Sequence, residues 1–151
     1  MNQVPLRLKY TAALRHLPTI HQQILAFAEK MGVSHKHKNQ IELVLEELLV
    51  NIISYAFTDE AEAHEIELIA DVSDDRKFVM TLIDDGKPYD PLTAPEPNLD
   101  VDIEHREIGG LGVMLVKQLM DDVTYRRENS RNILKLTLNI DVNEVQREES
   151  N

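Results

Sequence analysis

Glu47 and Asn51 are the residues of this chain whose types and spacing most suggest chemistry. They lie four positions apart in the segment EELLVNIISYAF, residues 46–57. Side chains four apart project from one face of an α-helix, so a helix here points both the same way. A buried amide without a partner costs about 1–3 kcal/mol, so a buried Asn51 would need a backbone, water or ligand partner. The pair is either an ordinary polar pair on a surface helix or part of a ligand site.

A helical wheel places the pair in a narrow polar strip between two apolar regions. At about 100° per residue, Glu47, Asn51 and Ser54 fall together, and Leu43 and Val50 lie beyond them. The broad apolar face of the same helix comprises Ile41, Val44, Leu45, Leu48 and Ile52. A polar strip bordered by apolar residues on both sides favours the floor of a cavity over an open solvated face.

A second motif follows an apolar strand. The segment LIDDGKPYDP, residues 82–91, ends that strand in an acid and then Gly86. Asp84 could accept a hydrogen bond from an amine such as that of adenine, and Gly86 would let the chain pass close to the base. Asp85 is a rival for this role, and a plain turn out of the strand is the other interpretation.

A third motif, GGLG at residues 109–112, opens a predicted helix. Its spacing matches neither the dinucleotide fingerprint nor the phosphate loop with its terminal lysine. A glycine-rich start to a helix nevertheless presents backbone N–H groups and a favourable dipole to an anion. A tight turn into a core helix is the alternative.

Periodicity predicts the elements that position these motifs. Gly32 is placed to end the first helix, and Ser34 can cap the second. A hairpin through 128–131 should join the last two strands, and residues 85–110 lack periodicity. The expected strands are 4–10, 64–72, 77–84, VTYRR and NILKLTLNI, and the expected helices are 14–31, 36–57 and 109–120.

Length and composition bound the class of protein. A chain of 151 residues suits a single domain, with a core of about 5–140 and a polar tail, 141–151. No apolar run approaches the length of a membrane span, and no cysteine is present. The net charge of −11 argues against a nucleic-acid partner and is compatible with a protein or a magnesium-bound nucleotide. We therefore expect a cytoplasmic protein with no membrane partner.

The three motifs together carry a family resemblance. In order, they are E-x-x-x-N on a helix, D-x-G after a strand, a loop of about 20 residues, and GGLG opening a helix. This order resembles the anti-sigma-factor serine/threonine kinases of bacteria, within the ATPase class that includes sensor histidine kinases, type II topoisomerases and Hsp90 chaperones. The phrase EIGGLGVMLVKQLMDDVTYRR favours the anti-sigma branch, and the similarity covers about residues 5–140.

The resemblance implies an α+β fold, a two-layer α/β sandwich whose mixed sheet is covered on one face by helices. ATP would bind between the helix layer and a lid, residues 94–108. Glu47 would be the catalytic base, Asn51 would coordinate Mg²⁺, and Asp84 would bind the adenine amine. Tyr55 replaces a histidine of many relatives, which leaves its phosphate or ribose contact open. The implied ATP-binding residues are Asn51, Tyr55, Asp84, Gly86, Gly110, Leu111, Gly112 and Val113.

The implied function is that of an ATP-dependent protein serine/threonine kinase that regulates transcription. It would bind a sigma factor and phosphorylate an anti-sigma-factor antagonist protein, and homodimers are expected from the resemblance alone. The alternative is a nucleotide-gated binding module of the same fold without kinase activity. A sensor-kinase domain is disfavoured, because 151 residues hold no phosphoacceptor helix pair.

Overall fold

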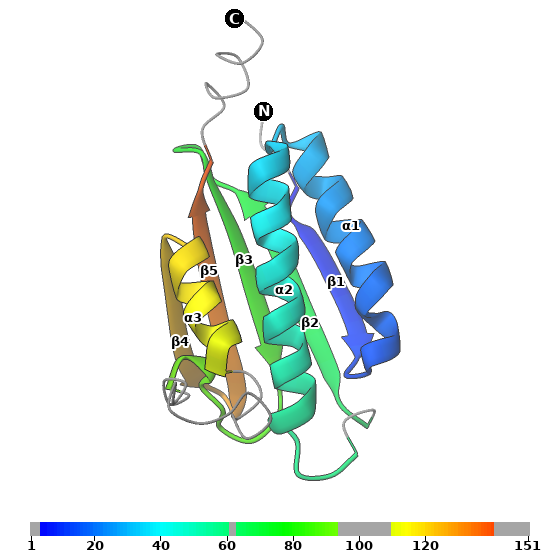
Figure 1. Ribbon diagram of the computed structural model, residues 1–151. Coiled ribbons are helices and arrows are strands. Elements are labelled where there is room, and N and C mark those ends of the chain that lie inside the picture. The colour runs from blue at the N-terminus through cyan, green and yellow to red at the C-terminus, as the bar shows by residue number, and fades with distance from the viewer. Residues whose placement is uncertain (1–3, 61–62, 94–109, 141–151) are drawn as a thin grey trace, which may run out of the picture.

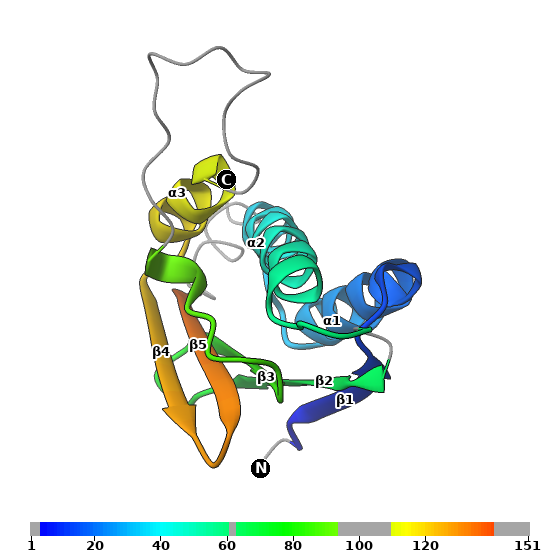
Figure 2. The same ribbon diagram turned by 90° about the horizontal axis from the view of Figure 1, so that it is seen from below.

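Over the residues that it describes, the structure, a computed structural model, has two layers, a five-stranded sheet and three α-helices that all lie on one face of it (Figures 1 and 2). It describes residues 4–60, 63–93 and 110–140. The strands are β1 (Leu6–Thr11), β2 (Glu65–Val72), β3 (Lys77–Asp84), β4 (Asp122–Glu128) and β5 (Arg131–Asn139). The helices are α1 (Leu17–Lys30), α2 (His35–Tyr55) and α3 (Gly110–Leu119), with short 3-10 turns at Leu14–His16 and Pro91–Thr93.

The strand order is β1-β2-β3-β5-β4, and every neighbouring pair is antiparallel. The expected α+β sandwich is confirmed, but the expectation of a mixed sheet is wrong. A strand–helix–strand crossover through α3 does leave β3 and β4 pointing the same way. The sheet is nevertheless antiparallel because β5 inserts between them and pairs with both.

The helical hairpin of α1 and α2 forms where the sequence predicts it. Gly32 takes a φ of 79° after α1, and the N–H of Val33 donates to the carbonyl of Ala28 at 3.0 Å, which is a glycine-based helix end. Ser34 then accepts a hydrogen bond from the N–H of His37 at 3.3 Å and caps α2. Both expected caps are confirmed, so the chain turns back at once and lays α2 across the middle of the sheet (Figure 1).

Alternation along β3 divides its side chains between the two faces of the sheet. Phe78, Met80 and Leu82 are buried under the helices, and Asp84 continues the same series. Fully burying one such apolar side chain stabilises the fold by about 1.5–3 kcal/mol. Since successive residues of a strand point to opposite faces, the core pattern itself directs Asp84 to the helix side.

The β4–β5 hairpin turns through Asn129 and Ser130, whose φ angles are 52° and 62°. Two central residues with positive φ are typical of the type I′ turn, whose twist matches that of the strands. Glu128 therefore pairs with Arg131, as the expected hairpin requires. The register that follows sets Asn132 opposite Asp84. Within the described ranges, no helix combines the length and apolarity that crossing a bilayer requires.

Candidate functional site

The polar strip of α2 is partly buried. Asn51 is only 3% exposed, and no hydrogen bond joins its side chain to another described residue. Glu47 is half-buried one turn earlier, and Ser54 is exposed. A surface helix pair would leave both polar groups in water, so the burial of Asn51 favours the cavity interpretation. A buried amide with no partner among the described residues is suited to a ligand or a cation.

The start of α3 lies directly against Glu47. A β-carbon placed on Gly112 would lie 2.0 Å from Oε2 of Glu47 and 2.7 Å from Cδ, closer than atoms can approach. Glycine therefore lets this backbone pack on the carboxyl group, and any larger residue would require the Glu47 side chain to move. The contact brings the first motif and the third together, although they are far apart in the sequence.

Asp84 is held at the end of β3 with its carboxyl group among buried residues. It is 4% exposed, and its Oδ1 accepts hydrogen bonds from the N–H of Gly86 and from Nδ2 of Asn132, both at 2.9 Å. Burial raises the pKa of Asp84, and the two hydrogen bonds oppose that rise. The group thus combines a desolvated carboxyl with a fixed orientation.

Gly86 joins the end of β3 to the end of α2. The N–H of Lys87 donates to the carbonyl of Ala56 at 2.8 Å, and a β-carbon on Gly86 would lie 2.3 Å from that carbonyl oxygen. The close approach requires glycine at this position. It brings the D-x-G motif to the C-terminal end of the helix that carries Asn51.

Asp85 points away from this group of residues. It is exposed, and its Oδ1 lies 3.1 Å from Nδ1 of His64, whose Nε2 lies 2.8 Å from Oδ1 of Asp59. The carboxylate of Asp59 raises the pKa of His64 through this hydrogen bond, and Asp85 adds a smaller contribution. Of the two candidate aspartates, the structure places Asp84 on the side of Glu47 and Asn51.

The remaining predicted residues lie around the same end of the molecule. Tyr55 is 41% exposed at the end of α2, with its ring centroid 6.2 Å from that of Tyr89. Val113 is buried in the first turns of α3, and Gly110 and Leu111 begin that helix. The predicted lid, 94–108, lies outside the described residues, as does the tail 141–151.

Asn132 is a buried polar residue that lies outside all three sequence motifs. It hydrogen-bonds the Asp84 carboxyl group and is only 3% exposed. A signal was present in NILKLTLNI, where the alternation that buries Leu134, Leu136 and Leu138 also puts Asn132 at an inward position. A polar residue at a core position of a strand is a candidate for a functional or structural network.

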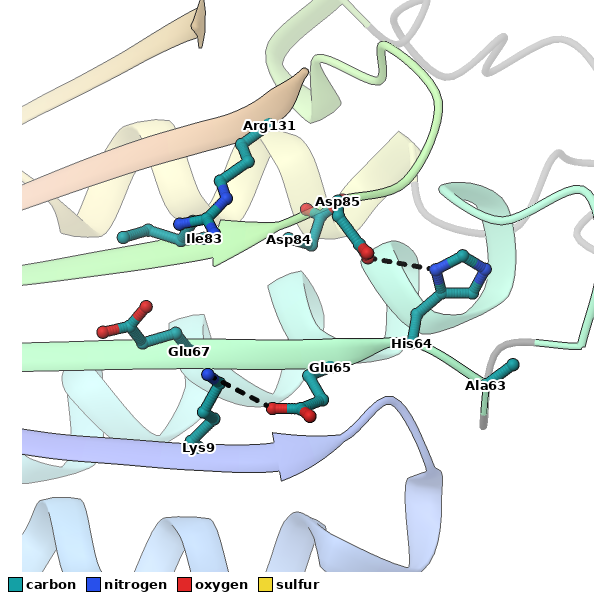
Figure 3. A pocket seen from close by; sticks show the side chains of 9 residues that line it. All are labelled: Lys9, Ala63, His64, Glu65, Glu67, Ile83, Asp84, Asp85 and Arg131. Carbon is teal, nitrogen blue, oxygen red and sulfur yellow. Dashed lines mark hydrogen bonds and ion pairs between the residues drawn. The ribbon is translucent and has the colours of Figure 1, made fainter. Parts of the chain in front are cut away.

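A separate hollow of about 260 Å³ lies on the opposite face of the sheet, at the ends of β1, β2 and β3 (Figure 3). His64 and Asp85 line it together with charged residues of the strands, and Lys9 pairs there with Glu65 at 3.5 Å. Neither Glu47 nor Asn51 borders this hollow. Asp84 does line it, so the hollow adjoins the helix-side site at the end of β3.

The donor set on the helix side fits a magnesium-bound nucleotide. A buried carboxyl, an amide with no hydrogen bond to another described residue, a carboxylate one helical turn away and a glycine-rich helix start come together where α2 and β3 end and α3 begins (Figure 1). Comparison with known proteins agrees: residues 10–138 match the histidine kinase-like ATPase domain model, and the chain belongs to this family. Membership of an ATPase family implies an ATP-binding domain.

Two relatives narrow the class of enzyme. The chain is 32% identical over 98 residues to the serine/threonine-protein kinase BtrW of Bordetella bronchiseptica, covering 64% of this chain and 67% of that protein. It is 22% identical over 133 residues to the serine-protein kinase RsbW of Bacillus mycoides, covering 85% and 81%. The expected family is confirmed, and the expected class of enzyme is the class of both relatives.

Solved structures support the fold. The RsbU and RsbW domains of Rv1364c from Mycobacterium tuberculosis superpose with a TM-score of 0.67 at 14% identity, over 91% of this chain and 33% of that one. This chain thus spans about a third of that solved chain. A blue-light activated histidine kinase of Erythrobacter litoralis superposes with a TM-score of 0.54 at 22% identity, over 75% of this chain and 33% of that one.

Proposed function

We propose that the chain binds magnesium-bound ATP between α2, the end of β3 and the start of α3, and transfers its γ-phosphoryl group to a serine or threonine of a partner protein. The observation that carries this proposal is the contact of Gly112 with Glu47. It sets the start of a glycine-rich helix, the expected place for phosphates, against the carboxylate that would act as base. The kinase relatives support the same reaction.

Glu47 and Asn51 divide the chemistry between them in this proposal. The half-buried Glu47 carboxylate accepts the proton of the attacking hydroxyl. The buried Asn51 amide, unpaired among the described residues, offers its carbonyl oxygen to Mg²⁺. When bound, Mg²⁺ neutralises charge that develops on the phosphates. The two groups are one helical turn apart, so a substrate hydroxyl and the metal would meet on the same face of α2.

The other two motifs bind the adenine and the phosphates of ATP in this proposal. Asp84 accepts a hydrogen bond from the adenine amino group, and the chain at Gly86 passes close to the adenine, with the β-carbon position of Gly86 turned toward the carbonyl of Ala56. Backbone N–H groups at 110–113 donate to the phosphates at the start of α3. Tyr55, which is exposed beside Tyr89, contacts the ribose or phosphates where many relatives carry histidine.

We infer protein partners from the family resemblance. The chain would bind a sigma factor as a homodimer in the cytoplasm, and would phosphorylate the antagonist protein that releases it. Its net charge of −11 supports protein partners over a nucleic acid. Regulation of transcription would then follow from the choice between two protein partners.

The test is transfer of label from [γ-³²P]ATP to candidate antagonist proteins of the anti-sigma-antagonist class. Acid-stable label on a serine or threonine of the antagonist is the expected result. Acid-labile label would indicate histidine phosphorylation. ATP binding without any label would indicate a nucleotide-gated binding module, and an absence of ATP binding would overturn the proposal entirely.

A further inference from the structure

Asn132 lies at the start of β5, directly opposite Asp84 in the register of β3 and β5. It is 3% exposed in a strand whose other inward residues are leucines. A buried amide is costly unless both its donor side and its acceptor side are paired. The hydrogen bonds around Asn132 therefore show what the position requires.

The donor side of the amide faces two acceptors. Nδ2 of Asn132 donates to Oδ1 of Asp84 at 2.9 Å and to the carbonyl of Lys87 at 2.8 Å. An asparagine NH₂ group has two hydrogens, so both are used. These bonds tie the Asp84 carboxyl to the loop that leaves β3.

The acceptor side of the amide faces three donors. Oδ1 of Asn132 accepts hydrogen bonds from the hydroxyl of Tyr125, from Nη1 of Arg127 at 3.1 Å, and from the N–H of Tyr89 at 3.2 Å. Rotating the amide by half a turn would set N–H against donors and oxygen against acceptors. The surroundings therefore fix the orientation of the amide, and with it the donor that Asp84 receives.

This network fixes how Asp84 presents its carboxyl group. The N–H of Gly86 and the Nδ2 of Asn132 both donate to Oδ1. No described residue hydrogen-bonds Oδ2, which leaves one oxygen of an oriented carboxyl as an acceptor for a ligand. A carboxylate acceptor suits an amino group and repels a carbonyl oxygen.

We propose that Asn132 is a positioning residue that holds Asp84 as an acceptor toward the amino group of the bound base, and thereby sets the preference for adenine over bases that carry a carbonyl there. The inference rests on the proposed nucleotide site and extends it to a residue outside the three motifs. Leucine, the residue type at the next inward positions of β5, would remove the donor to Asp84.

Two other charged groups act electrostatically on the Asp84 carboxyl. Asp85, its neighbour in sequence, raises the pKa of Asp84, and Arg127 on β4 lowers it by less than the hydrogen bonds do. Arg127 reaches this region through Nη1, which donates to the carbonyl of Gly86 at 2.7 Å. His64 and Arg131 lie on the far side of the sheet, in the hollow of Figure 3.

The first experiment compares the affinities of ATP and of purine riboside triphosphate, which lacks only the 6-amino group. The parent should prefer ATP by about 10–100-fold, the contribution of a hydrogen bond to a charged group. Asn132→Leu should reduce that ratio to a few-fold. Tyr125→Phe is the matched control, because it removes a bond to Asn132 and leaves both donors to Asp84; it should keep the parent ratio.

The second experiment follows the titration of the Asp84 carboxyl by ¹³C NMR without nucleotide. Asn132→Leu should raise the pKa of Asp84 above its parent value, since a donor to the ionised form is lost, and Tyr125→Phe should not. If Asn132→Leu does not fold, Asn132→Asp is tested in its place, because aspartate has the same shape as asparagine. Two facing carboxyls should then take up a proton at higher pH than Asp84 does in the parent.

The outcomes separate this inference from the proposed function. A folded Asn132 variant with the parent ratio and the parent titration would overturn the role of Asn132 and leave the nucleotide site standing. Equal affinity of the parent for both triphosphates would also overturn it. A parent that binds neither triphosphate would overturn the proposed function and this inference together.

Discussion

Gly112→Ala tests the contact between α3 and Glu47, which brings the two halves of the proposed site together. The added β-carbon would lie 2.0 Å from Oε2 of Glu47, where real contacts begin at about 3.0 Å, so the carboxylate or the helix must move by about 1 Å. A displacement of about 1 Å in a catalytic group can reduce a rate by about 10²-fold. We expect phosphoryl transfer to fall by that order.

The effect on the free energy of unfolding should be modest. Alanine is favoured over glycine inside a helix by about 1 kcal/mol, and overpacking costs about 1–3 kcal/mol. The difference predicts a loss of about 0–2 kcal/mol in the free energy of unfolding. Urea unfolding and single-turnover transfer from ATP measure the two quantities on one preparation.

A double-mutant cycle with Glu47→Ala tests whether Gly112→Ala acts by displacing the Glu47 carboxylate. Without the Glu47 carboxylate, Gly112→Ala has nothing to displace, so it should stabilise the protein by about 1 kcal/mol and cause no further loss of transfer. Equal effects of Gly112→Ala on stability in both backgrounds would refute the contact. Parent-level transfer by the single variant would refute its role in catalysis.

Three further predictions address other parts of the structure. Gly86→Ala should lower the free energy of unfolding by about 1–3 kcal/mol in urea titrations, because its β-carbon would lie 2.3 Å from a backbone carbonyl oxygen of the α2 end. The carboxylate of Asp59 raises the pKa of His64 above 6.5, so this stabilisation is complete below about pH 6.5 and is lost as pH rises through the raised value. His64→Gln should therefore remove part of the decrease in Tm on going from about pH 6 to pH 8, and an unchanged decrease would show that the pair does not stabilise the fold. Asp84→Asn should weaken ATP binding in calorimetric titrations more than Asp85→Asn. The reverse order would show that Asp85, and not Asp84, binds the adenine.

Most of the fold could be predicted because its elements carry strong local patterns. Alternation in β3 and the caps at Gly32 and Ser34 involve neighbours in sequence, which periodicity and capping preferences describe well. The antiparallel pairing of all neighbouring strands could not be predicted in the same way. The insertion of β5 between β3 and β4 is a long-range pairing with no local signal.

The same difference between local and long-range signals applies to the candidate site. The helical spacing of Glu47 and Asn51 predicted that both project from one face of α2, and the end of the alternating segment predicted that Asp84 lies at a strand terminus. The role of Asn132 depends on its pairing with a residue 48 positions earlier, which only the register of β5 against β3 reveals. The contact of Gly112 with Glu47 likewise depends on how α3 packs on α2.

The central claim is that Glu47 is the catalytic base and Asn51 the magnesium ligand of one nucleotide site. The most direct test measures both Mg–ATP affinity and phosphoryl transfer for Glu47→Ala, with Asn51→Ala as the matched variant one turn away. Glu47→Ala should keep affinity within a few-fold and lose about 10²–10⁴-fold in transfer, and Asn51→Ala should instead lose magnesium-dependent affinity. Full transfer to an antagonist protein by Glu47→Ala would contradict the claim.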